Sequence, residues 1–369
     1  MPQLPTVCHI TTVHPRYDIR IFRKQCMSLS KFYQVVLIVA DGKGHEKKNG
    51  ISIHDAGLTQ TSRIKRFTQS KAHIFNAAIS KNAAIYHLHD PELLPLGLKL
   101  LKAGKHVIYD SHEDVPRQIL SKEYIPTIFK SVISHLYEIY ENRCAKKYSC
   151  IVAATPFIEK RFKKYNPCTI SVNNYPIAEE FRQNTKPEKK PNVVCYVGAI
   201  TKNRGICETL EALKDTPLEL HLAGSFVDKN LQRTLQKNKL WKQVQYFGFV
   251  NRKDVVEIIS ASNAGLVTLH PTKNYIDSLP IKMFEYMAAG LAVVASDFPL
   301  WKTIINEFDC GIAVDPLNPS EIREALMYLI KHPLEAERMG RNGLKAIEKY
   351  NWRNEKEKLL SIYDNLISK

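Results

Sequence analysis

Residues 274–296 read NYIDSLPIKMFEYMAAGLAVVAS, and this segment decides the fold. A loop with one acid, Asp277, leads into a helix predicted to begin near Ile281. The helix carries a second acid, Glu285, eight residues after the first, and Gly290 is typical of a helix end. The apolar run that follows has the length and composition of a buried strand. A helix joined by a tight glycine turn to a buried strand is the repeating unit of a parallel α/β sheet.

The same alternation of strand and helix extends in both directions from this segment. Short apolar runs typical of buried strands occupy residues 7–12, 35–40, 84–88, 105–109, 150–154, 192–197, 218–222, 244–247, 264–269 and 292–295. Helical patterns occupy residues 19–30, 92–102, 207–213, 254–260, 282–288, 320–331 and 333–350, and Ser320 is the predicted N-cap of the helix at 320. The fold class predicted is therefore α/β.

The length of 369 residues predicts two domains, because single hydrophobic cores stop growing beyond roughly 250–300 residues. The alternation pauses at residues 173–192, where two prolines and the charged stretch 186–190 indicate a linker. We therefore expect Rossmann-like domains at residues 1–175 and 176–350. Ligands of such sheets bind beyond the carboxyl ends of the strands, so we expect the two domains to face each other across a cleft.

The net charge of +16 is concentrated in the first half of the chain. Residues 1–178 hold 26 Lys and Arg against 13 Asp and Glu, whereas residues 179–369 hold 27 against 24. This asymmetry indicates an anionic partner, for which a phosphorylated substrate, an anionic membrane surface and nucleic acid are the candidates. No nucleic-acid-binding motif is recognisable, so nucleic acid is not expected as a partner.

The cysteines and the start of the chain indicate a compartment. The eight cysteines are scattered without a Cys-x-x-Cys pair, which favours neither a zinc site nor a disulfide framework. A reduced, cytoplasmic location fits best. The first residues lack the pattern of a signal peptide, and no apolar run reaches the roughly 18 residues of a membrane span.

The segment that decides the fold also carries residues suited to a nucleotide. A helix N-terminus presents free N–H groups and a positive dipole to a phosphate. Lys282, in the first helical turn, can neutralise a phosphate, and the carboxylate of Glu285 can accept hydrogen bonds from two ribose hydroxyls. By spacing alone the segment also fits a plain amphipathic helix with its polar face in solvent.

A second motif, YVGAITKNRG at residues 196–205, places a glycine at the end of a strand and a cation before the next glycine. Gly198 allows the backbone to approach a phosphate closely, and Arg204 or Lys202 can stabilise a leaving diphosphate. Gly224 and the segment 247–250, which contains Phe249, end two further strands of the same half. Each of these motifs alone is equally consistent with an ordinary strand–turn–helix connection.

Polar side chains also follow the strands of the first half. The segments 12–22, 86–92 and 109–113 contain the polar residues His14, Arg16, Arg20, His89, Asp90 and His112. For any single histidine among them a structural hydrogen bond is the more common role, and it is their concentration at strand ends that indicates a site. Clusters of His, Asp and Glu can also bind a metal ion.

Together these segments resemble retaining glycosyltransferases of family 4, which have the GT-B fold of two Rossmann-like domains. The resemblance rests on the acid-x7-acid pattern of Asp277 and Glu285, on Gly198 and Arg204, and on His112. The family usually has Glu at the first acid, where this chain has Asp277, and Arg where this chain has Ala199. The segment after Glu285 resembles a subgroup common in bacterial surface-polysaccharide synthesis. The end of the chain, residues 351–369, resembles the family's helix that returns to the first domain.

The resemblance implies transfer of a sugar, with retention, from a nucleotide-diphosphate-sugar to a glycan or polyprenyl-diphosphate-linked acceptor. It favours a UDP-sugar over a GDP-sugar and implies no metal or other cofactor. The implied catalytic residues are His112, Asp277, Arg204 and Lys282. The implied donor-binding residues are Gly198, Lys202, Arg204, Gly224, Phe249, Ser278, Leu279, Lys282 and Glu285. The implied acceptor-binding residues are His14, Arg16, Arg20, His89 and Asp90.

An apolar stripe within residues 128–144 has two interpretations. It is formed by Ile128, Phe129, Val132, Ile133, Leu136, Tyr137, Tyr140 and Cys144. The more common interpretation of such a stripe is a helix packed on the core. The alternative is a surface that lies on an anionic membrane, which would place the protein peripherally on the inner face of the membrane.

Other functions compatible with the sequence are a GT-B sugar-nucleotide epimerase, an inverting transferase and a non-catalytic nucleotide-sugar-binding module. A nicotinamide-dependent enzyme is disfavoured, because the Gly-x-Gly-x-x-Gly pattern is absent after the first strand.

Overall fold

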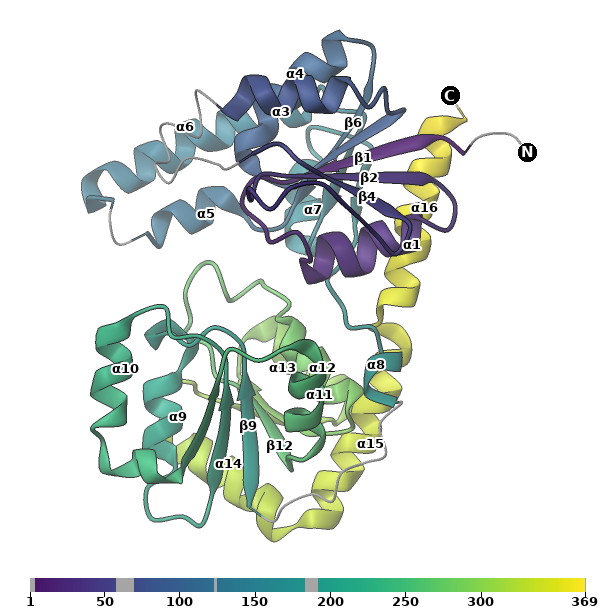
Figure 1. The fold of residues 1–369 in the computed structure, drawn as a ribbon. Helices are drawn as coiled ribbons and strands as arrows, with labels where there is room; N and C mark the ends of the chain where they lie inside the picture. The colour runs from purple at the N-terminus through teal and green to yellow at the C-terminus, as the bar shows by residue number, and fades with distance from the viewer. Residues whose placement is uncertain (1–3, 58–69, 123–124, 183–191, 369) are drawn as a thin grey trace. The chain divides into compact units, whose positions relative to one another are not determined.

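The computed structural model describes residues 4–57, 70–122, 125–182 and 192–368. The chain divides into two compact units, Met1–Asn174 with Arg353–Lys369 and Tyr175–Trp352. Each unit contains its own sheet with helices packed against it (Figure 1). The predicted α/β fold with two domains built on parallel sheets is therefore confirmed. The charged stretch 186–190 lies outside the described residues.

The sheet of the first unit has one point at which the order of its strands reverses. In sheet order its strands are β3 (Glu46–Lys48), β4 (Ile51–Asp55), β2 (Gln34–Val39), β1 (Thr6–Ile10), β5 (Ile85–Leu88), β6 (His106–Ser111), β7 (Cys150–Ala153) and β8 (Thr169–Ser171). Among the described strands of this sheet, only β3 pairs with its neighbour in the antiparallel direction. The chain moves outward on one side of β1 and then returns to β5 on its other side. Ligands of doubly wound sheets bind at such a switch point.

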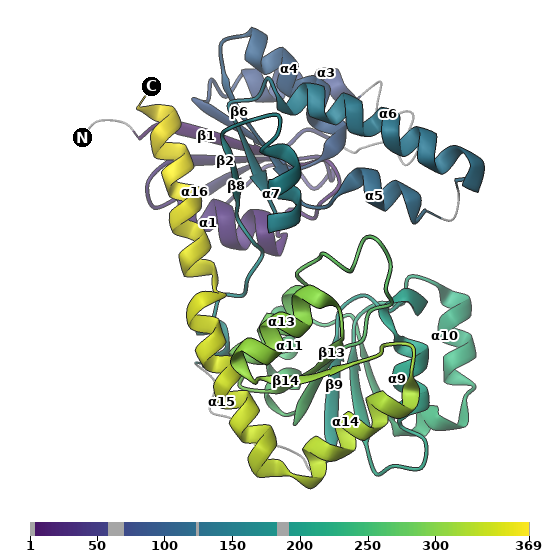
Figure 2. The ribbon, with the colours of Figure 1, turned by 180° about the vertical axis from the view of Figure 1, so that it is seen from behind.

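Helices cover both faces of this sheet (Figures 1 and 2). They are η1 (Ile19–Cys26), α1 (Met27–Leu29), α3 (Ser70–Ile79), η2 (Pro91–Leu93), α4 (Leu94–Lys102), α5 (Val115–Leu120), α6 (Thr127–Ala145), α7 (Pro156–Phe162) and α16 (Trp352–Ile367). Alternate residues of the strands, such as Cys8 and Tyr86, join one apolar core with α3, α4, α6 and α7. Residues between them, such as His9 and His87, therefore point to the opposite face. On that face α16 contributes Tyr363, which hydrogen-bonds to both histidines.

The sheet of the second unit is parallel throughout. Its strands in sheet order are β11 (Val244–Gly248), β10 (Glu219–Ala223), β9 (Val193–Val197), β12 (Ala264–Val267), β13 (Ala292–Ser296) and β14 (Gly311–Val314). Counted from β9, this is the order 3-2-1-4-5-6 of a Rossmann fold, with its switch point between β9 and β12.

The helices of the second unit are α8 (Glu179–Arg182), η3 (Lys202–Arg204), α9 (Ile206–Ala212), α10 (Lys229–Gln236), η4 (Lys239–Gln243), α11 (Arg252–Ser260), α12 (Ile281–Ala288), α13 (Pro299–Phe308), α14 (Pro319–Lys331) and α15 (Pro333–Lys349). Of these, α9, α11, α12, α14 and α15 begin and end close to the predicted positions, whereas α8, η3, α10, η4 and α13 were not predicted. The predicted N-cap at Ser320 is wrong. Asn318 caps α14 and accepts hydrogen bonds from the backbone N–H groups of Ser320 and Glu321, because Pro319 takes the first helical position.

Candidate functional site

Three glycines bring the strand ends of the second unit into close contact. Gly224 has φ 142°, and a Cβ atom there would lie 1.8 Å from the carbonyl oxygen of Gly198. Gly205 has φ 74°, and a Cβ atom there would lie 1.9 Å from the carbonyl oxygen of Thr268. No side chain fits at either position, so the loops after β9, β10 and β12 touch through their backbones. At the switch point of this sheet the loops therefore pack closely through their backbones.

Arg204 lies against this edge. A Cβ atom on Gly198 would lie 3.7 Å from Arg204 Nη1, so the guanidinium group is next to the first loop. The guanidinium group interacts with the hydroxyl groups of Tyr196 on β9 and Tyr275 in the loop after β12. It thus connects the two strands that flank the switch point.

Lys282 occupies the first turn of α12 and is buried. Its Nζ lies 3.5 Å from the centroid of the Tyr196 ring and has no hydrogen-bond partner among the described residues. Burial, and next the nearby cation of Arg204, lower the pKa of Lys282 well below its usual value. Burying an amine without a partner costs free energy, so the arrangement suits an anion that is absent from the free protein. A phosphate would supply both the missing hydrogen bonds and the compensating charge.

Glu285, one turn further along α12, is held by a residue that the sequence analysis missed. Arg252 Nη1 donates to Glu285 Oε1 over 2.5 Å, and Arg252 Nη2 lies 2.8 Å from Glu180 Oε2. Both Glu285 and Arg252 are largely buried. No spacing in the sequence connects Arg252 with α12, because the two positions meet only through the packing of α11 beside it.

The remaining predicted donor residues lie on loops, apart from Lys202, which begins η3. Asp277, Lys202 and Phe249 are exposed, and Phe249 follows the end of β11 with 86% of its surface accessible. The hydroxyl of Ser278 donates to the Tyr275 carbonyl over 2.8 Å, and Leu279 packs on the apolar core. The structure therefore brings the backbones of Gly198 and Gly224 into contact, holds Arg204, Lys282 and Glu285 in partly or fully buried positions, and leaves Asp277, Lys202 and Phe249 at the surface. The roles predicted for these residues stay predictions.

The predicted acceptor residues of the first unit lie at the switch point between β1 and β5. Asp90 is buried and accepts hydrogen bonds from Thr12 N over 2.5 Å and from Thr11 Oγ1 over 3.0 Å. His14 Nε2 lies 3.4 Å from the second carboxylate oxygen of Asp90. Asp90 thus fixes the loop after β1, and His14 is the more exposed of the pair.

Arg16 and Arg20 are both engaged in buried ion pairs. Arg16 Nη2 lies 2.6 Å from Asp41 Oδ1, and its Nη1 lies 3.1 Å from Glu46 Oε2. Arg20 Nη2 lies 2.7 Å from Asp110 Oδ1. These pairs hold η1 and the loop before it against the sheet. These ion pairs already engage both guanidinium groups within the protein itself. The role of Arg16 and Arg20 in acceptor binding therefore stays a prediction.

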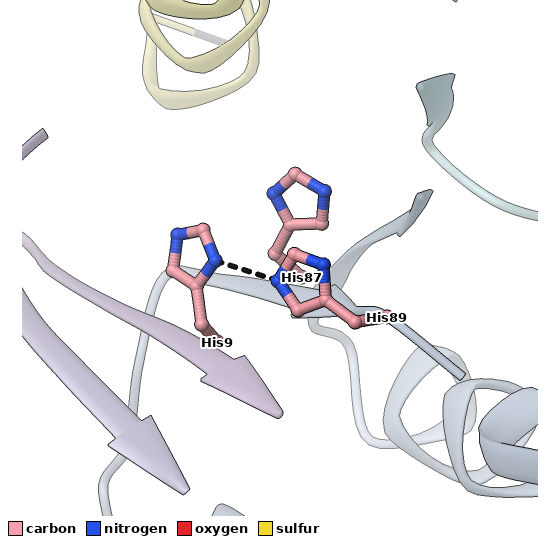
Figure 3. Close-up of side chains that lie close together, drawn as sticks. All are labelled: His9, His87 and His89. Atoms are coloured by element: carbon pink, nitrogen blue, oxygen red, sulfur yellow. Dashed lines mark hydrogen bonds between the residues drawn. The ribbon is translucent and has the colours of Figure 1, made fainter. Parts of the chain in front are cut away.

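Four histidines and a carboxylate gather on the face of the sheet below α16. His9 is opposite His87 in the register of β1 and β5, and His89 lies two residues further along the same face (Figure 3). Asp110 Oδ2 lies 3.4 Å from both His89 Nδ1 and His112 Nε2. Burial opposes the charge of Asp110, but the Arg20 guanidinium together with His112 and His89 outweighs it, and these groups hold the pKa of Asp110 well below its usual range.

Two overlapping groups in this cluster have ligand atoms close enough for a metal ion. They are His9, His87 and His89 (Figure 3), and His89, Asp110 and His112. Hydrogen bonds join the histidines of both groups, for example between His9 Nδ1 and His89 Nε2 over 2.9 Å. Arg20 Nε also donates to Asp110 Oδ2 over 3.1 Å. The positive charge of Arg20 would repel a metal cation bound to the same oxygen. The geometry is that of a hydrogen-bonded chain, and the absence of a metal requirement stays a prediction.

The apolar stripe of residues 128–144 lies on α6 and is mostly exposed. Ile128, Val132 and Leu136 keep 77%, 56% and 61% of their surface accessible, and only Cys144 at the far end is buried. The interpretation as a helix packed on the core is therefore wrong for the first three turns. Among the described residues no helix has the length and apolar composition to cross a bilayer.

Comparisons with known proteins agree with this architecture. Residues 177–346 match the family described as "Glycosyl transferases group 1". The chain is 23% identical over 279 residues to the D-rhamnosyltransferase WbpZ of Pseudomonas aeruginosa, an alignment that covers 72% of this chain and 68% of that protein. The glycosyltransferase MJ1069 of Methanocaldococcus jannaschii is matched over 48% of its length and the sucrose-phosphate synthase of Spinacia oleracea over 16%.

Solved structures show the same fold. The sucrose-phosphate synthase of Thermosynechococcus elongatus superposes with a TM-score of 0.77 at 17% identity, covering 99% of both chains. The HepE protein of Anabaena in complex with UDP superposes with a TM-score of 0.72 at 13% identity, covering 98% of this chain and 100% of that one. The order of strands in both units and these likenesses identify the GT-B fold. The chain is therefore a glycosyltransferase whose second unit carries a group 1 glycosyl transferase domain.

Proposed function

We propose that this enzyme transfers a sugar, with retention, from a UDP-sugar to a glycan or polyprenyl-diphosphate-linked acceptor, as a member of family 4 in bacterial surface-polysaccharide synthesis. The observation that carries the proposal is the buried, unpartnered amine of Lys282 beside Arg204 at the N-terminus of α12. A diphosphate is the chemical group that fits a guanidinium cation, a buried unpartnered amine and a helix N-terminus at once. UDP in the complexes of HepE, which has the same fold, supports uracil as the base.

In this proposal the second unit binds the donor. Arg204 and Lys282 hold the diphosphate, and Glu285 accepts hydrogen bonds from the ribose, oriented by its ion pair with Arg252. Asp277 contacts the donor sugar from its loop, and Lys202, Ser278, Leu279 and Phe249 line the remainder of the site. At Gly198 a Cβ atom would meet only Arg204 Nη1, at 3.7 Å, so the missing side chain leaves room for a phosphate next to the backbone.

The transfer needs no covalent nucleophile from the protein. The bond between the anomeric carbon and the diphosphate oxygen breaks, and the acceptor oxygen bonds to the same carbon from the same face. The proton of the acceptor hydroxyl passes to the departing diphosphate. Arg204 and Lys282 stabilise the negative charge that develops on that leaving group, while His112 contacts the transferred sugar and the first unit binds the acceptor through His14, His89 and Asp90. No metal ion is required in this scheme.

The experiment that tests the donor site is thermal-shift binding of UDP, GDP, ADP and NAD. A ligand that binds only the folded protein at about 100 times its Kd stabilises it by about 2.7 kcal/mol, which is readily detected. We expect UDP to stabilise the wild type and to lose that effect in Glu285→Gln. Glu257→Gln, at a position 56% exposed on α11, is the matched control and should keep it. Stabilisation by NAD alone, or an undiminished UDP effect in Glu285→Gln, would refute the donor site.

Retention is tested on the product. After transfer from the nucleotide-sugar identified by the binding experiment, the anomeric configuration of the product is read by NMR. The same configuration as in the donor is expected, and inversion would show that the enzyme is an inverting transferase. A sugar-nucleotide isomer released without any acceptor would show that it is an epimerase.

We also propose that the exposed face of α6 rests on an anionic membrane at the cytoplasmic side, where a polyprenyl-linked acceptor is found. Phe129, Ile133 and Tyr140 extend the exposed apolar face of Ile128, Val132 and Leu136. Arg143, Lys146 and Lys147 are exposed at the end of the same helix, so apolar insertion and attraction to anionic lipid act together.

Vesicle co-sedimentation tests this membrane surface. The wild type should bind vesicles that contain anionic lipid more strongly than neutral vesicles, and Leu136→Glu should weaken that binding. Leu334→Glu is the matched control, because Leu334 is 78% exposed on α15 in the second unit. Equal binding by both variants would exclude α6 as the contact.

A further inference from the structure

A continuous chain of hydrogen bonds runs from α16 to His112 in the first unit. Tyr363 Oη lies 2.7 Å from His87 Nδ1 and 3.0 Å from His9 Nε2. His9 Nδ1 lies 2.9 Å from His89 Nε2, and His89 Nδ1 lies 3.1 Å from His112 Nε2. We call these five residues the histidine chain. Only His112 among them is partly exposed, with 16% of its side chain accessible.

The direction of the hydrogen bonds is the same along the whole chain. Burial lowers the pKa of His9, His87 and His89 well below the usual value, so these rings are neutral. A neutral imidazole has one N–H group and one bare nitrogen, and Tyr363 has one O–H group. Each ring that donates to one neighbour must therefore accept from the other. Tyr363 Oη could accept from both His9 and His87, but its own O–H group would then donate to no member of the chain. Two arrangements satisfy every link and also use that O–H group, and they differ in which nitrogen of His112 carries the proton.

In the first arrangement His112 Nε2–H donates to His89, and the donations continue through His9 and Tyr363 to His87 Nδ1. The proton of His87 is then on Nε2, which lies 3.8 Å from Asp110 Oδ2. In the second arrangement every donation is reversed. His87 Nε2 is then a bare nitrogen that faces the carboxylate, and His112 carries its proton on Nδ1.

Asp110 distinguishes the two arrangements. Its carboxylate is ionised and buried, so it attracts N–H groups and repels bare nitrogen atoms. Three ring nitrogens face Oδ2, those of His87, His89 and His112. The first arrangement turns two N–H groups and one bare nitrogen toward it, and the second turns one N–H group and two bare nitrogens. The first arrangement is therefore favoured.

The hydroxyl of Tyr363 couples the tautomer of His87 to that of His112 through the hydrogen-bonded chain. Without its hydroxyl, the tautomer of His87 is independent of the other three rings. The two ring nitrogens of His89 and His112 that face Asp110 at equal distances of 3.4 Å then balance each other. His87 Nε2 has no hydrogen-bond partner of its own among the described residues, so its interaction with Asp110 acts on the chain only through Tyr363.

We infer that Tyr363 is a positioning residue that fixes His112 in the Nε2–H tautomer and leaves its Nδ1 as a hydrogen-bond acceptor for a hydroxyl group of the sugar. The part that concerns the sugar rests on the proposed function. The part that concerns the tautomer depends only on the histidine chain. A residue near the end of the sequence thus sets the chemical character of a residue at the end of β6.

The tautomer is measured directly by long-range 1H–15N NMR of protein labelled with 15N-histidine. The spectra are recorded at about pH 8. The His112→Gln spectrum identifies the signals of His112. In the wild type we expect the proton on Nε2, and in Tyr363→Phe we expect both His112 nitrogens to shift toward the averaged values of mixed tautomers.

Tyr33→Phe is the matched control. The hydroxyl of Tyr33 also bonds to α16, at Asp364, and its ring lies 5.6 Å from that of Tyr363, but it is not part of the histidine chain. It should leave the His112 signals as they are in the wild type. We expect kcat to fall about tenfold in Tyr363→Phe relative to Tyr33→Phe, with little change in the KM of the donor, which corresponds to about 1.4 kcal/mol or one hydrogen bond.

The outcomes are separable. A wild-type His112 with its proton on Nδ1, or identical His112 signals in Tyr363→Phe and Tyr33→Phe, would overturn the inference whatever the activity. The expected NMR result together with an unchanged kcat would overturn the part that concerns the sugar. Failure of the proposed function appears instead as absence of transfer by the wild type, which leaves the NMR result intact.

Discussion

Replacing Lys282 by methionine should stabilise the protein and weaken its binding of a nucleoside diphosphate. The amine is buried over the ring of Tyr196 without a hydrogen-bond partner among the described residues. A buried polar group left unpaired costs about 1–3 kcal/mol, and methionine removes it at similar volume. For a unit of this size each kcal/mol raises Tm by about 2–4 °C. A charge-assisted hydrogen bond to phosphate is worth about 1.5–3 kcal/mol, so the affinity for UDP should fall about 10- to 150-fold.

The stability gain should depend on pH with a defined sign. Burial lowers the pKa of Lys282 in the folded protein below its unfolded value of about 10.5. Between the two values the unfolded chain binds a proton that the folded chain does not, so the wild type loses stability as pH falls through this window. Lys282→Met lacks that loss. Its advantage in free energy of unfolding should therefore be larger at about pH 7 than at about pH 9.5.

The assay is urea unfolding at both pH values, with UDP titrations by calorimetry. Lys302→Met, at an exposed position on α13, serves as the control and should change stability by less than about 0.5 kcal/mol. A destabilised Lys282→Met variant with unchanged affinity for UDP would refute the reasoning, since the amine would then be structural. A stabilised variant with unchanged affinity would place the phosphate elsewhere.

Further substitutions and conditions test other parts of the structure. Gly224→Ala should destabilise the second unit by more than about 2 kcal/mol, because its Cβ would lie 1.8 Å from the Gly198 carbonyl oxygen. Gly248, at φ 68°, has no atom within 4 Å of its Cβ position, so Gly248→Ala should cost only about 1 kcal/mol in the same denaturation assay. Arg252→Met should cost about 3–5 kcal/mol, because it removes the cation shared by buried Glu285; a loss below about 1 kcal/mol would contradict the ion pair. The three buried rings of the histidine chain have pKa values in the folded protein below the unfolded value of about 6.5. The free energy of unfolding should therefore fall by up to about 1.4 kcal/mol per ring and pH unit as the solution is acidified below that pH. A urea midpoint that stays constant between about pH 7 and about pH 5.5 would show that these rings are also protonated in the folded protein.

The sequence by itself determined the α/β class, the two sheets and the position of the key helix. Periodicity is a local property, so α12 was expected near Ile281 and observed from Ile281 to Ala288. Short and partly exposed strands were less predictable. β3, β4, β8 and β14 were missed, because runs of three to five residues with partly exposed positions give no clear pattern. Ser320 was predicted as the cap because serine commonly caps helices, but Pro319 takes the first helical position and Asn318 is the cap.

Only the tertiary structure decided what the candidate residues contact. A strand end shows that a polar side chain is near an edge of the sheet, but sheet order determines its neighbours. The register of β1 and β5 placed His9 beside His87, and α16 brought Tyr363 to both from the far end of the chain. The same limit applies to α6. Its apolar stripe is visible in the sequence, but whether other elements cover it depends on packing between segments distant in the chain, and the structure leaves it exposed.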